Sequence, residues 1–525
     1  MPLTLMKPTA SVALPSYKNL ALIVLLLLTG GTVFGQTNSV APDPIEGKWY
    51  GVVGFPTDRV ELGFEFKRNE RQELKAYLYS PVVNFYGLEL PGLVKRDGQN
   101  YINDAYGLSV TLKDGVLEGT YFPFKAPILL KRTDKLPVEV PLPELPKGPG
   151  PKWQVKLGSG IYAPVAVRDG SVYVGTSGGL FHSISLKDGS FIWTFAAGRA
   201  IHGEALVTET HVYFICDNGF LFKLDRKTGK EVWRYDLGDS TVPRFLPHQI
   251  VDNSGDFDWD YHAPRPLLIE DVIYVGSGDG SMHAVNATTG ERVWRFAAKG
   301  KIRTDAVSDG SRLFFGTFDN FVYAVDRQTG SKVWEKDTHG PISNSPALIG
   351  DRLIIGNRNG LLAALSPATG EVFWRMLFWG SSVESTAVAD EAGLFYIGAS
   401  DMRRISLIDS KDGRVVWRSD VYGWPWARPA LSEKVLFASV AGGSPYQVRH
   451  LASLTALDRK SGKILWRWPM PEWPGSFLNG FIAAPVIADK TVVVGGLDGT
   501  LYGFAVEYER EGQHWFGQGS EARTR

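Results

Sequence analysis

The stretch Val172 to Trp193, VYVGTSGGLFHSISLKDGSFIW, decides the fold because it returns in register four more times. The other copies are Val212–Trp233, Ile273–Trp294, Leu313–Trp334 and Leu353–Trp374. Each copy has an apolar strand, a turn with Gly, a second strand, a Thr-Gly or Asp-Gly turn and then Trp. A Gly precedes a Trp by four residues in seven places, from Gly189/Trp193 to Gly462/Trp466. This fixed offset indicates an array of one supersecondary unit.

Eight tryptophans mark the array, and the distance between most neighbours predicts propeller blades of about 40 residues with four short strands. They are Trp153, Trp193, Trp233, Trp294, Trp334, Trp374, Trp417 and Trp466. Each indole is expected to pack on the next blade and to donate to its backbone. Before the first full copy stands a lone strand at Trp153, and the last set has three strands without Trp. We therefore expect that strand to complete the last blade, which closes a ring of eight.

The combination T-G-x-x-x-W with V-Y-x-G-x-x-D-G upstream resembles the pyrroloquinoline quinone (PQQ) repeat, or tryptophan-docking propeller. Its clearest instance runs from Ile273 to Gly280, followed by Thr289, Gly290 and Trp294. The resemblance implies an all-β, eight-bladed propeller. The family includes quinoprotein alcohol dehydrogenases and also non-catalytic members, such as the propeller lipoprotein of outer-membrane protein assembly.

The region 44–132 lacks the Trp repeat and shows period-2 alternation, which predicts a small antiparallel β-barrel or sandwich. Its opening, Gly47-Lys48-Trp49-Tyr50-Gly51, resembles the small β-barrel that precedes the catalytic domain of some secreted α/β-hydrolases. No hydrolase domain follows this region, so hydrolase activity is not expected. We divide the rest into a Pro-rich linker at 133–150 that acts as a spacer, the propeller at 151–507 and a polar tail at 508–525.

The first 35 residues read as a signal peptide, because Lys7 and Lys18 precede the apolar run Leu20–Leu28. An uncleaved anchor is the alternative. No Cys lies near the cleavage site, so no lipoprotein is expected, and no later run is long enough to span a membrane. We expect an exported, soluble monomer in the periplasm or outside the cell. The single cysteine, Cys216, reads as a buried structural thiol.

Charge excludes one class of partner. Lys and Arg number 56, and Asp and Glu also number 56, so nothing indicates nucleic-acid binding.

Polar residues precede the first strand of each blade, and these positions line the channel mouth of a propeller. They are Tyr162, His202, Arg265, Arg303, Asn344, Glu384 and Arg428, with Trp426 nearby. Arginine forks suit an anionic ligand, whereas Glu384 with Asn344 suits a hard cation. The alternative is a solvated mouth in which these charges pair with one another.

An insertion at Thr241–Pro264 carries Asp256, Asp258 and Asp260, which could bind Ca²⁺. The spacing does not match an EF-hand loop, and a solvated acidic loop is the alternative. The aromatic run Tyr422–Trp426, with Phe378 and Trp379, suits either stacking on sugars, peptides or a planar cofactor, or ordinary packing between loops.

We expect a binding or scaffold function, with an envelope protein or a carbohydrate as partner, and assign no catalytic residue. The alternative is a PQQ-dependent dehydrogenase of an alcohol or sugar, with Ca²⁺. Against it, such enzymes commonly carry two adjacent cysteines where this chain has one in all, and most blades are minimal. No C-x-x-C-H haem motif occurs.

Overall fold

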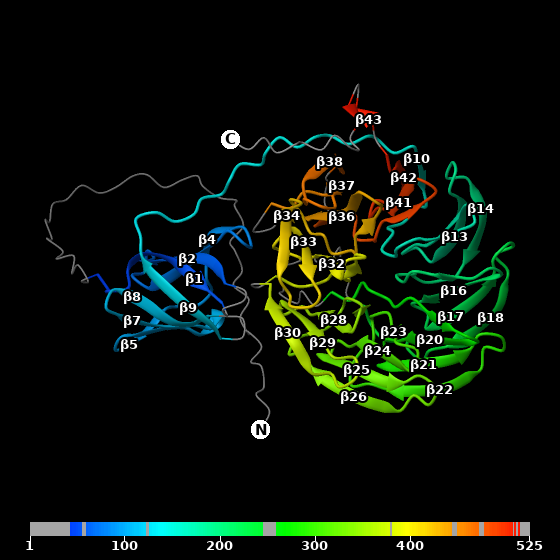
Figure 1. Ribbon diagram of the computed structural model, residues 1–525, viewed down its shortest axis with the longest axis horizontal. Helices are drawn as coiled ribbons and strands as arrows, with labels where there is room; N and C mark the ends of the chain where they lie inside the picture. The colour runs from blue at the N-terminus through cyan, green and yellow to red at the C-terminus, as the bar shows by residue number, and fades with distance from the viewer. Residues whose placement is uncertain are drawn as a thin grey trace, which may run out of the picture.

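The computed structural model describes residues 42–54, 59–121, 125–244, 259–378, 381–443, 449–471, 477–507, 509–510 and 513–514. The predicted signal peptide lies outside them, as does most of the tail. The described chain is all-β, with one 3-10 turn, η1 (Asp104–Tyr106). Figure 1 shows a small sheet beside a propeller. Within the described ranges no helix is long and apolar enough to cross a membrane.

The N-terminal sheet has nine antiparallel strands in the order β4-β3-β2-β1-β9-β8-β7-β6-β5. They are β1 (Gly47–Val53), β2 (Val60–Arg68), β3 (Leu74–Ser80), β4 (Phe85–Glu89), β5 (Lys95–Asp97), β6 (Asn100–Asn103), β7 (Leu108–Lys113), β8 (Val116–Tyr121) and β9 (Ala126–Arg132). Burial alternates along β3, as its period-2 pattern predicts. Trp49 is fully buried, and its Nε1 donates to the carbonyl of Ile45 at 2.7 Å. The sheet curls around this core, in agreement with the predicted barrel-like domain.

Seven propeller blades are consecutive in the chain, each an antiparallel sheet whose strands pair in sequence order. Blades 1 and 2 comprise β11 (Ala166–Arg168), β12 (Ser171–Gly175), β13 (Leu180–Ser185), β14 (Phe191–Ala196), β15 (Leu206–Val207), β16 (His211–Cys216), β17 (Phe220–Asp225) and β18 (Glu231–Asp236). Blades 3 and 4 comprise β19 (Leu267–Ile269), β20 (Val272–Gly276), β21 (Ser281–Asn286), β22 (Arg292–Ala297), β23 (Val307–Ser308), β24 (Arg312–Gly316), β25 (Phe321–Asp326) and β26 (Lys332–Asp337). Blades 5 and 6 comprise β27 (Ala347–Ile349), β28 (Arg352–Gly356), β29 (Leu361–Leu365), β30 (Val372–Leu377), β31 (Val388–Ala389), β32 (Leu394–Gly398), β33 (Arg404–Asp409) and β34 (Val415–Asp420). Blade 7 comprises β35 (Ala430–Leu431), β36 (Val435–Gly443), β37 (Ser453–Asp458) and β38 (Ile464–Pro469), with β39 (Leu478–Gly480) paired to β36.

The eighth blade joins the two ends of the propeller and confirms the predicted closure. Its strands are β40 (Val486–Ala488), β41 (Thr491–Gly495), β42 (Thr500–Ala505) and, as outer strand, β10 (Trp153–Lys156). The antiparallel register runs from Trp153↔Gly503 to Lys156↔Thr500. Figure 1 shows the cyan β10 beside the red β42. Without β10, the last blade would have only three strands and β42 would be an open sheet edge. Pairing with β10 removes that edge. A short hairpin, β43 (Glu509–Arg510) with β44 (Gln513–His514), follows.

The repeated Trp and Gly form one interlock between neighbouring blades. Trp153, Trp193, Trp294 and Trp334 each donate from Nε1, at 3.0 Å, to a carbonyl 33 residues further along the chain. The repeated Gly lies against the Trp of the preceding blade: a Cβ on Gly330 would stand 2.7 Å from the Trp294 ring, and Gly330 has φ +72°. Both features require glycine.

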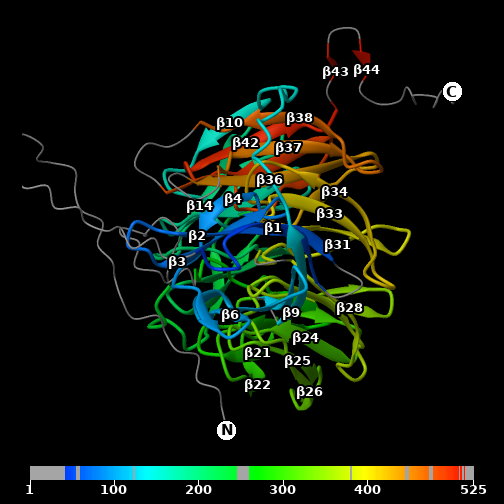
Figure 2. The ribbon, with the colours of Figure 1, turned by 90° about the vertical axis from the view of Figure 1, so that its left-hand side faces the viewer.

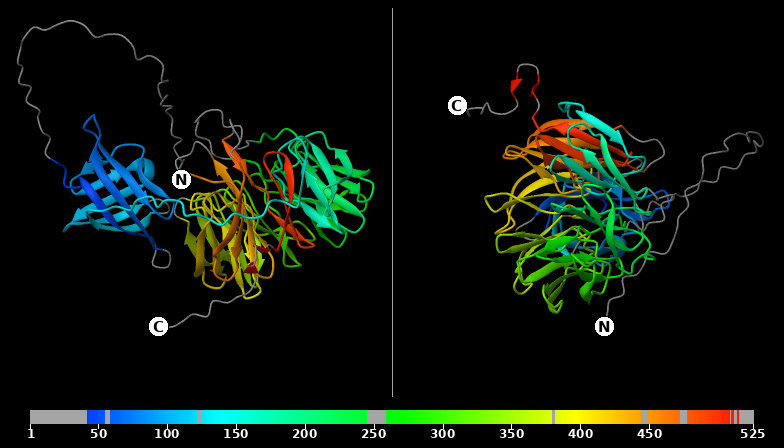
Figure 3. Two further views of the ribbon diagram at one scale, coloured as in Figure 1. Left: turned by 90° about the horizontal axis from the view of Figure 1, so that it is seen from above. Right: turned by 90° about the vertical axis from the view of Figure 1, so that its right-hand side faces the viewer.

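The linker binds to the propeller, which differs from the predicted spacer. Arg467 of β38 donates its N–H to Pro146 at 2.9 Å, and Gly148 donates to the Arg467 carbonyl at 2.7 Å. An extended segment thus pairs with the outer edge of blade 7. Figure 3 shows the cyan linker running from the N-terminal sheet along the propeller to β10.

The N-terminal sheet also contacts the propeller directly; Figure 2 views the molecule with this sheet in front of the propeller. Arg403 donates to Asn84 Oδ1 at 2.8 Å, and Val82 and Val83 share a hydrophobic cluster with Phe378 and Met402. The two parts therefore pack as one body.

Candidate functional site: the mouth of the propeller channel

The loops that precede the first strands are tied to one another around the channel mouth. The backbone N–H of Arg265 donates to Asp305 Oδ1 at 2.7 Å, that of Asp305 to Ser345 Oγ at 2.9 Å, and that of Ser345 to Thr386 Oγ1 at 3.1 Å. In blades 4, 5 and 6 one short polar side chain thus satisfies the backbone of the blade before it. The loops of blades 3 to 6 are tied in series, which restrains the side chains next to these ties.

Seven of the eight expected mouth residues line one small cavity of about 80 Å³: Tyr162, His202, Arg303, Asn344, Glu384, Trp426 and Arg428. Arg265, the eighth, points instead to Glu204, with Nη1 to Oε1 at 3.5 Å. Glu204 and Ser343 also line the cavity. The structure thus brings seven of these residues together around one cavity and adds the partners of their charges.

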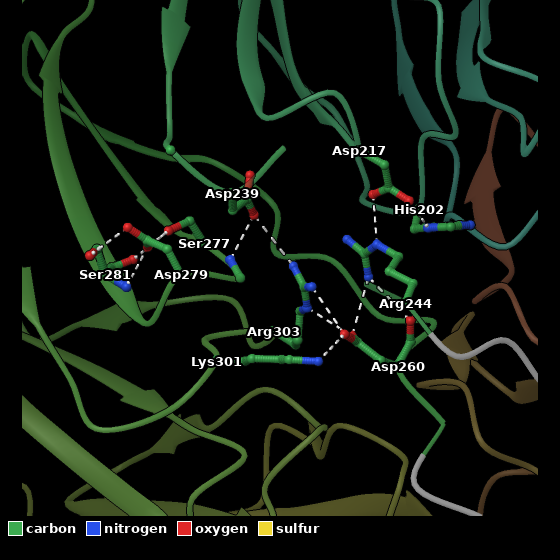
Figure 4. Close-up of polar contacts among 12 residues, drawn as sticks. His202, Asp217, Asp239, Arg244, Asp260, Ser277, Asp279, Ser281, Lys301 and Arg303 are labelled. Atoms are coloured by element: carbon green, nitrogen blue, oxygen red, sulfur yellow. Dashed lines mark hydrogen bonds and ion pairs between the residues drawn. The ribbon is translucent and has the colours of Figure 1, made fainter. Parts of the chain in front are cut away.

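Asp260 is the counter-ion of the mouth arginine Arg303. Arg303 Nε contacts Oδ1 at 2.7 Å and Nη2 contacts Oδ2 at 3.0 Å, while Lys301 Nζ reaches Oδ2 at 3.2 Å (Figure 4). Asp260 and Arg303 are 2% and 3% exposed. Burial raises the pKa of Asp260, but the charges of Arg244 and Arg303 outweigh it and hold the pKa below its ordinary value.

The same network continues to His202 (Figure 4). Arg244 Nε contacts Asp217 Oδ1 at 2.6 Å, and His202 Nδ1 lies 3.1 Å from Asp217 Oδ2. Burial lowers the pKa of His202, more than Asp217 raises it. His202 is therefore a neutral, oriented ring whose Nε2 has no hydrogen-bond partner among the described residues.

Glu384 belongs to a second network and is not free to bind a cation. Arg358 Nε contacts Oε1 at 3.0 Å, Ser343 Oγ donates to Oε2 at 2.6 Å, and His262 Nε2 lies 3.4 Å from Oε2. Burial raises the pKa of Glu384, but the charge of Arg358 and the bond from His262 prevail and lower it to about 2. The carboxylate is ionised and fully engaged.

A third ion pair joins opposite sides of the mouth. Arg428 Nη2 donates to Glu204 Oε2, although 224 residues separate them. The charge of Glu204 raises the pKa of Arg428, while burial outweighs the two nearby arginines and raises the pKa of Glu204. The mouth is therefore an internally paired ring, which was one of the two alternatives from the sequence.

The insertion at 241–264 supplies the carboxylate that pairs with Arg303 and also covers part of the site. Its described end, 259–264, brings Asp260 to Arg303, and Arg358 Nη2 donates to the carbonyl of Trp259. Asp256 and Asp258, the other predicted calcium ligands, lie outside the described residues. Within the described ranges no group of three or more His, Cys, Asp or Glu is placed to hold a metal ion. Asp260 itself is occupied by cations of the protein.

The aromatic residues near the mouth pack on one another. Trp259 meets Trp426 edge-on with centroids 5.4 Å apart, and Trp426 stacks on Trp424 at 4.9 Å. These three rings and Tyr261 are buried. Because they are buried, these four rings offer no exposed face on which a sugar could stack.

PQQ does not fit the mouth. The cavity of about 80 Å³ is well below the roughly 300 Å³ at which pockets for organic ligands begin. The arginines that would hold its carboxylates, Arg303 and Arg428, already bind Asp260 and Glu204. Asn344 Oδ1 is a buried acceptor without a partner in the described part of the chain, and with His202 Nε2 it suits water.

Sequence reasoning missed the partners of the mouth residues. Glu204 follows His202 by two residues, and Arg358 lies between the second and third strands of blade 5, so neither stands at the repeated position. The expected mouth residues contain more arginines than acids. This excess could have indicated that further acidic partners exist, because buried charges in proteins are paired.

Comparison with known proteins identifies a family match. The sequence profile described as "Outer membrane protein assembly factor BamB" matches residues 150–254, 224–394 and 401–512, well over half of the chain. No curated protein sequence matches the chain.

Many solved structures share the fold. A computationally designed protein, Ika8, aligns with a TM-score of 0.53 at 14% identity, over 68% of this chain and 100% of its own. Sqt1 of Saccharomyces cerevisiae aligns with 0.53 at 14%, over 68% and 98%. Quinohemoprotein alcohol dehydrogenase from Comamonas testosteroni aligns with 0.51 at 16%, over 71% and 79%. A designed protein, a yeast protein and an enzyme give equal likeness, so these neighbours describe the fold alone.

Proposed function

Because the chain belongs to the family described as outer membrane protein assembly factor BamB, we propose that it is an exported, non-catalytic scaffold of the cell envelope that binds protein partners. One observation carries the proposal. The acids Asp260, Glu384 and Glu204 at the channel mouth are each closed by an arginine of the chain itself, and the space left is about 80 Å³.

An internally paired mouth favours binding over chemistry for a physical reason. Ligands and catalytic cofactors need charges that are desolvated but not yet satisfied. Buried pairs such as Arg303–Asp260 have their hydrogen bonds already and resist reorganisation, because opening them leaves an unpaired buried charge. The mouth then acts as the rigid hub of the ring, and the outer surface of the blades is left for partners.

The test separates the scaffold from the quinoprotein alternative. The chain without residues 1–35 is titrated with PQQ and Ca²⁺ by calorimetry, and dye-linked alcohol oxidation is followed in parallel. We expect neither heat of binding at tens of micromolar nor turnover.

A second experiment tests the scaffold role directly, in cells of the source organism. A photo-crosslinking residue is placed at Val232, Val293 or Val333, exposed positions on three outer strands. We expect adducts with a defined envelope protein. One-to-one PQQ binding with alcohol turnover would overturn the proposal.

A further inference from the structure

Several faces between neighbouring blades hold an aromatic layer. In blades 1, 3 and 7 the residue two positions after the repeated Trp is aromatic and packs on rings of the next blade, whereas blades 5, 6 and 8 have Met376, Ser419 and Val155 at this position. In blade 1 it is Phe195, whose ring lies 5.5 Å from Phe222. In blade 3 it is Phe296, with Tyr323 at 5.5 Å and Phe315 at 6.1 Å. In blade 7 it is Trp468, with Tyr502 at 5.3 Å.

Between blades 4 and 5 this layer lacks its rings. The outer residue is Lys336, and the blade 5 residues that correspond to Phe315 and Tyr323 are Ile355 and Ala363, which pair with each other in register. A hollow of about 290 Å³ with a mainly apolar lining remains there, and Asp337, His339 and Arg375 also border it. Its lining on blade 5 includes Leu361, Leu365 and Leu377.

The hollow has the size and chemistry of a ring site. Dry cavities of about 150 Å³ lined by aliphatic side chains bind benzene. The equivalent spaces of blades 1, 3 and 7 are occupied by aromatic rings of the chain itself. Lys336 is partly buried at the edge of the hollow, and its Nζ has no hydrogen bond or ion pair within the described ranges. A carboxylate beside the ring would satisfy that ammonium.

The strand beside the hollow has a free edge. β26 ends the strand order of blade 4, so within the described residues its outer side pairs with no strand. The linker shows how such an edge is used, since Pro146–Gly148 pairs with β38, the corresponding strand of blade 7. Main-chain pairing of this kind supplies affinity, and a side-chain pocket supplies specificity.

We propose that the hollow between blades 4 and 5 is a binding site for an aromatic side chain next to a carboxylate, presented by an extended segment of a partner protein along β26. The inference deepens the proposed scaffold function and rests on it. It names the partner's chemistry: an edge strand with Phe, Tyr or Trp beside Asp or Glu.

The first experiment uses 3-phenylpropionate, an aromatic ring with a carboxylate, in a ligand-observed NMR titration of the chain without residues 1–35. We expect saturable binding that weakens at least tenfold in Lys336→Phe, because the new ring fills the hollow as Phe296 does between blades 3 and 4. The same change should raise the Tm. Lys332→Phe, on the exposed face of the same strand, is the matched control and should bind as the wild type does.

Ala363→Leu fills the hollow from the opposite side and serves if Lys336→Phe does not fold. A second probe, the peptide acetyl-Thr-Glu-Phe-Val-Thr-amide, tests the occupant, and its Phe-to-Ala twin should bind at least tenfold more weakly. Absence of 3-phenylpropionate binding, or equal binding to the filled variants, overturns the site. Equal binding of the twin peptides overturns the occupant. Neither result touches the PQQ test or crosslinking from Val232 and Val293, which lie on other blades and test the scaffold role separately.

Discussion

At the scale of single residues, the channel mouth shows how burial and charge oppose each other. Glu384 is 8% exposed, and desolvation alone would keep it protonated. Arg358, Ser343 and His262 together reverse that effect. A carboxyl whose pKa is lowered on folding stabilises the folded state above its unfolded pKa, and that contribution is lost as the pH falls through the folded pKa.

Glu384→Gln is expected to lower the free energy of unfolding by about 3 kcal/mol at pH 7, because Arg358 loses its buried counter-ion. The wild type should lose this advantage between pH 4.5, the ordinary pKa, and about 2, the folded value. Urea unfolding at several pH values measures both effects. Glu335→Gln, which breaks surface pairs with Lys299 and Lys332, should cost under about 1 kcal/mol. Equal losses in the two variants would contradict the buried pairing.

His182 adds a second dependence on pH. It is 3% exposed, and burial lowers its pKa to about 4 from 6.5. Between these values the unfolded chain takes up a proton that the folded chain refuses, so stability falls as the pH drops from 6.5 to 4.

His182→Phe places at this position the residue type that blade 2 has in Phe222, and it should flatten the fall in stability between pH 6.5 and 4. Thermal unfolding over this range measures the slope. His339 is exposed, with a side chain 71% accessible, so His339→Asn should leave the slope unchanged. A slope that persists in His182→Phe would assign the effect to other buried groups, such as His202.

At the scale of the structural element, one interlock recurs between neighbouring blades, and small departures from it have consequences. Blade 2 is the clearest departure. Lys223 Nζ donates to the carbonyl of Ala287 at 2.8 Å, the acceptor that the repeat offers to Trp233, and Trp233 Nε1 has no partner in the described chain. The hollow beside Lys336 is another departure. The repeat thus supplies a frame in which exceptions mark positions with their own role.

The interlock predicts unequal costs for two otherwise similar glycine changes. Both glycines have a positive φ, which for Gly310 is +97°. A Cβ on residue 330 would lie 2.7 Å from the Trp294 ring, whereas a Cβ on residue 310 would have no atom within 4 Å. We expect Gly310→Ala to cost about 1 kcal/mol and Gly330→Ala to cost about 2 kcal/mol more, because the Trp must shift. Urea unfolding compares them. Equal costs would mean that the Trp ring moves freely.

At the scale of the whole molecule, stability depends on closing the ring between chain positions far apart. β10 pairs with β42 across more than 340 residues, and Arg428 meets Glu204 across 224. The linker fastens blade 7 next to this seam. Opening the seam would expose the edge of β42, and exposed edges pair with other chains.

Val155→Pro tests the closure, since proline removes a ladder donor in the middle of β10. We expect a loss of about 2–3 kcal/mol and concentration-dependent association, followed by urea unfolding and size-exclusion chromatography. Val138→Pro, at a linker position 77% exposed, should cause neither the loss of stability nor the association. A monomeric, fully stable Val155→Pro chain would show that the seam contributes little.

Sequence alone determined the all-β class, the eight blades and the closure at Trp153, and seven of the eight residues it proposed for the channel mouth line one cavity. It could do so because each rests on local periodicity: strand alternation, Gly before Trp at a fixed offset, and polar residues before each first strand.

Only the tertiary structure decided which charges meet. Asp260 reaches Arg303 across 43 residues and Glu204 reaches Arg428 across 224, and no spacing rule encodes such contacts. The hollow at Lys336 likewise exists only because Ile355 and Ala363 face it from the next blade. Side-chain pairing and cavities depend on how separate elements pack, and a linear pattern holds no record of that.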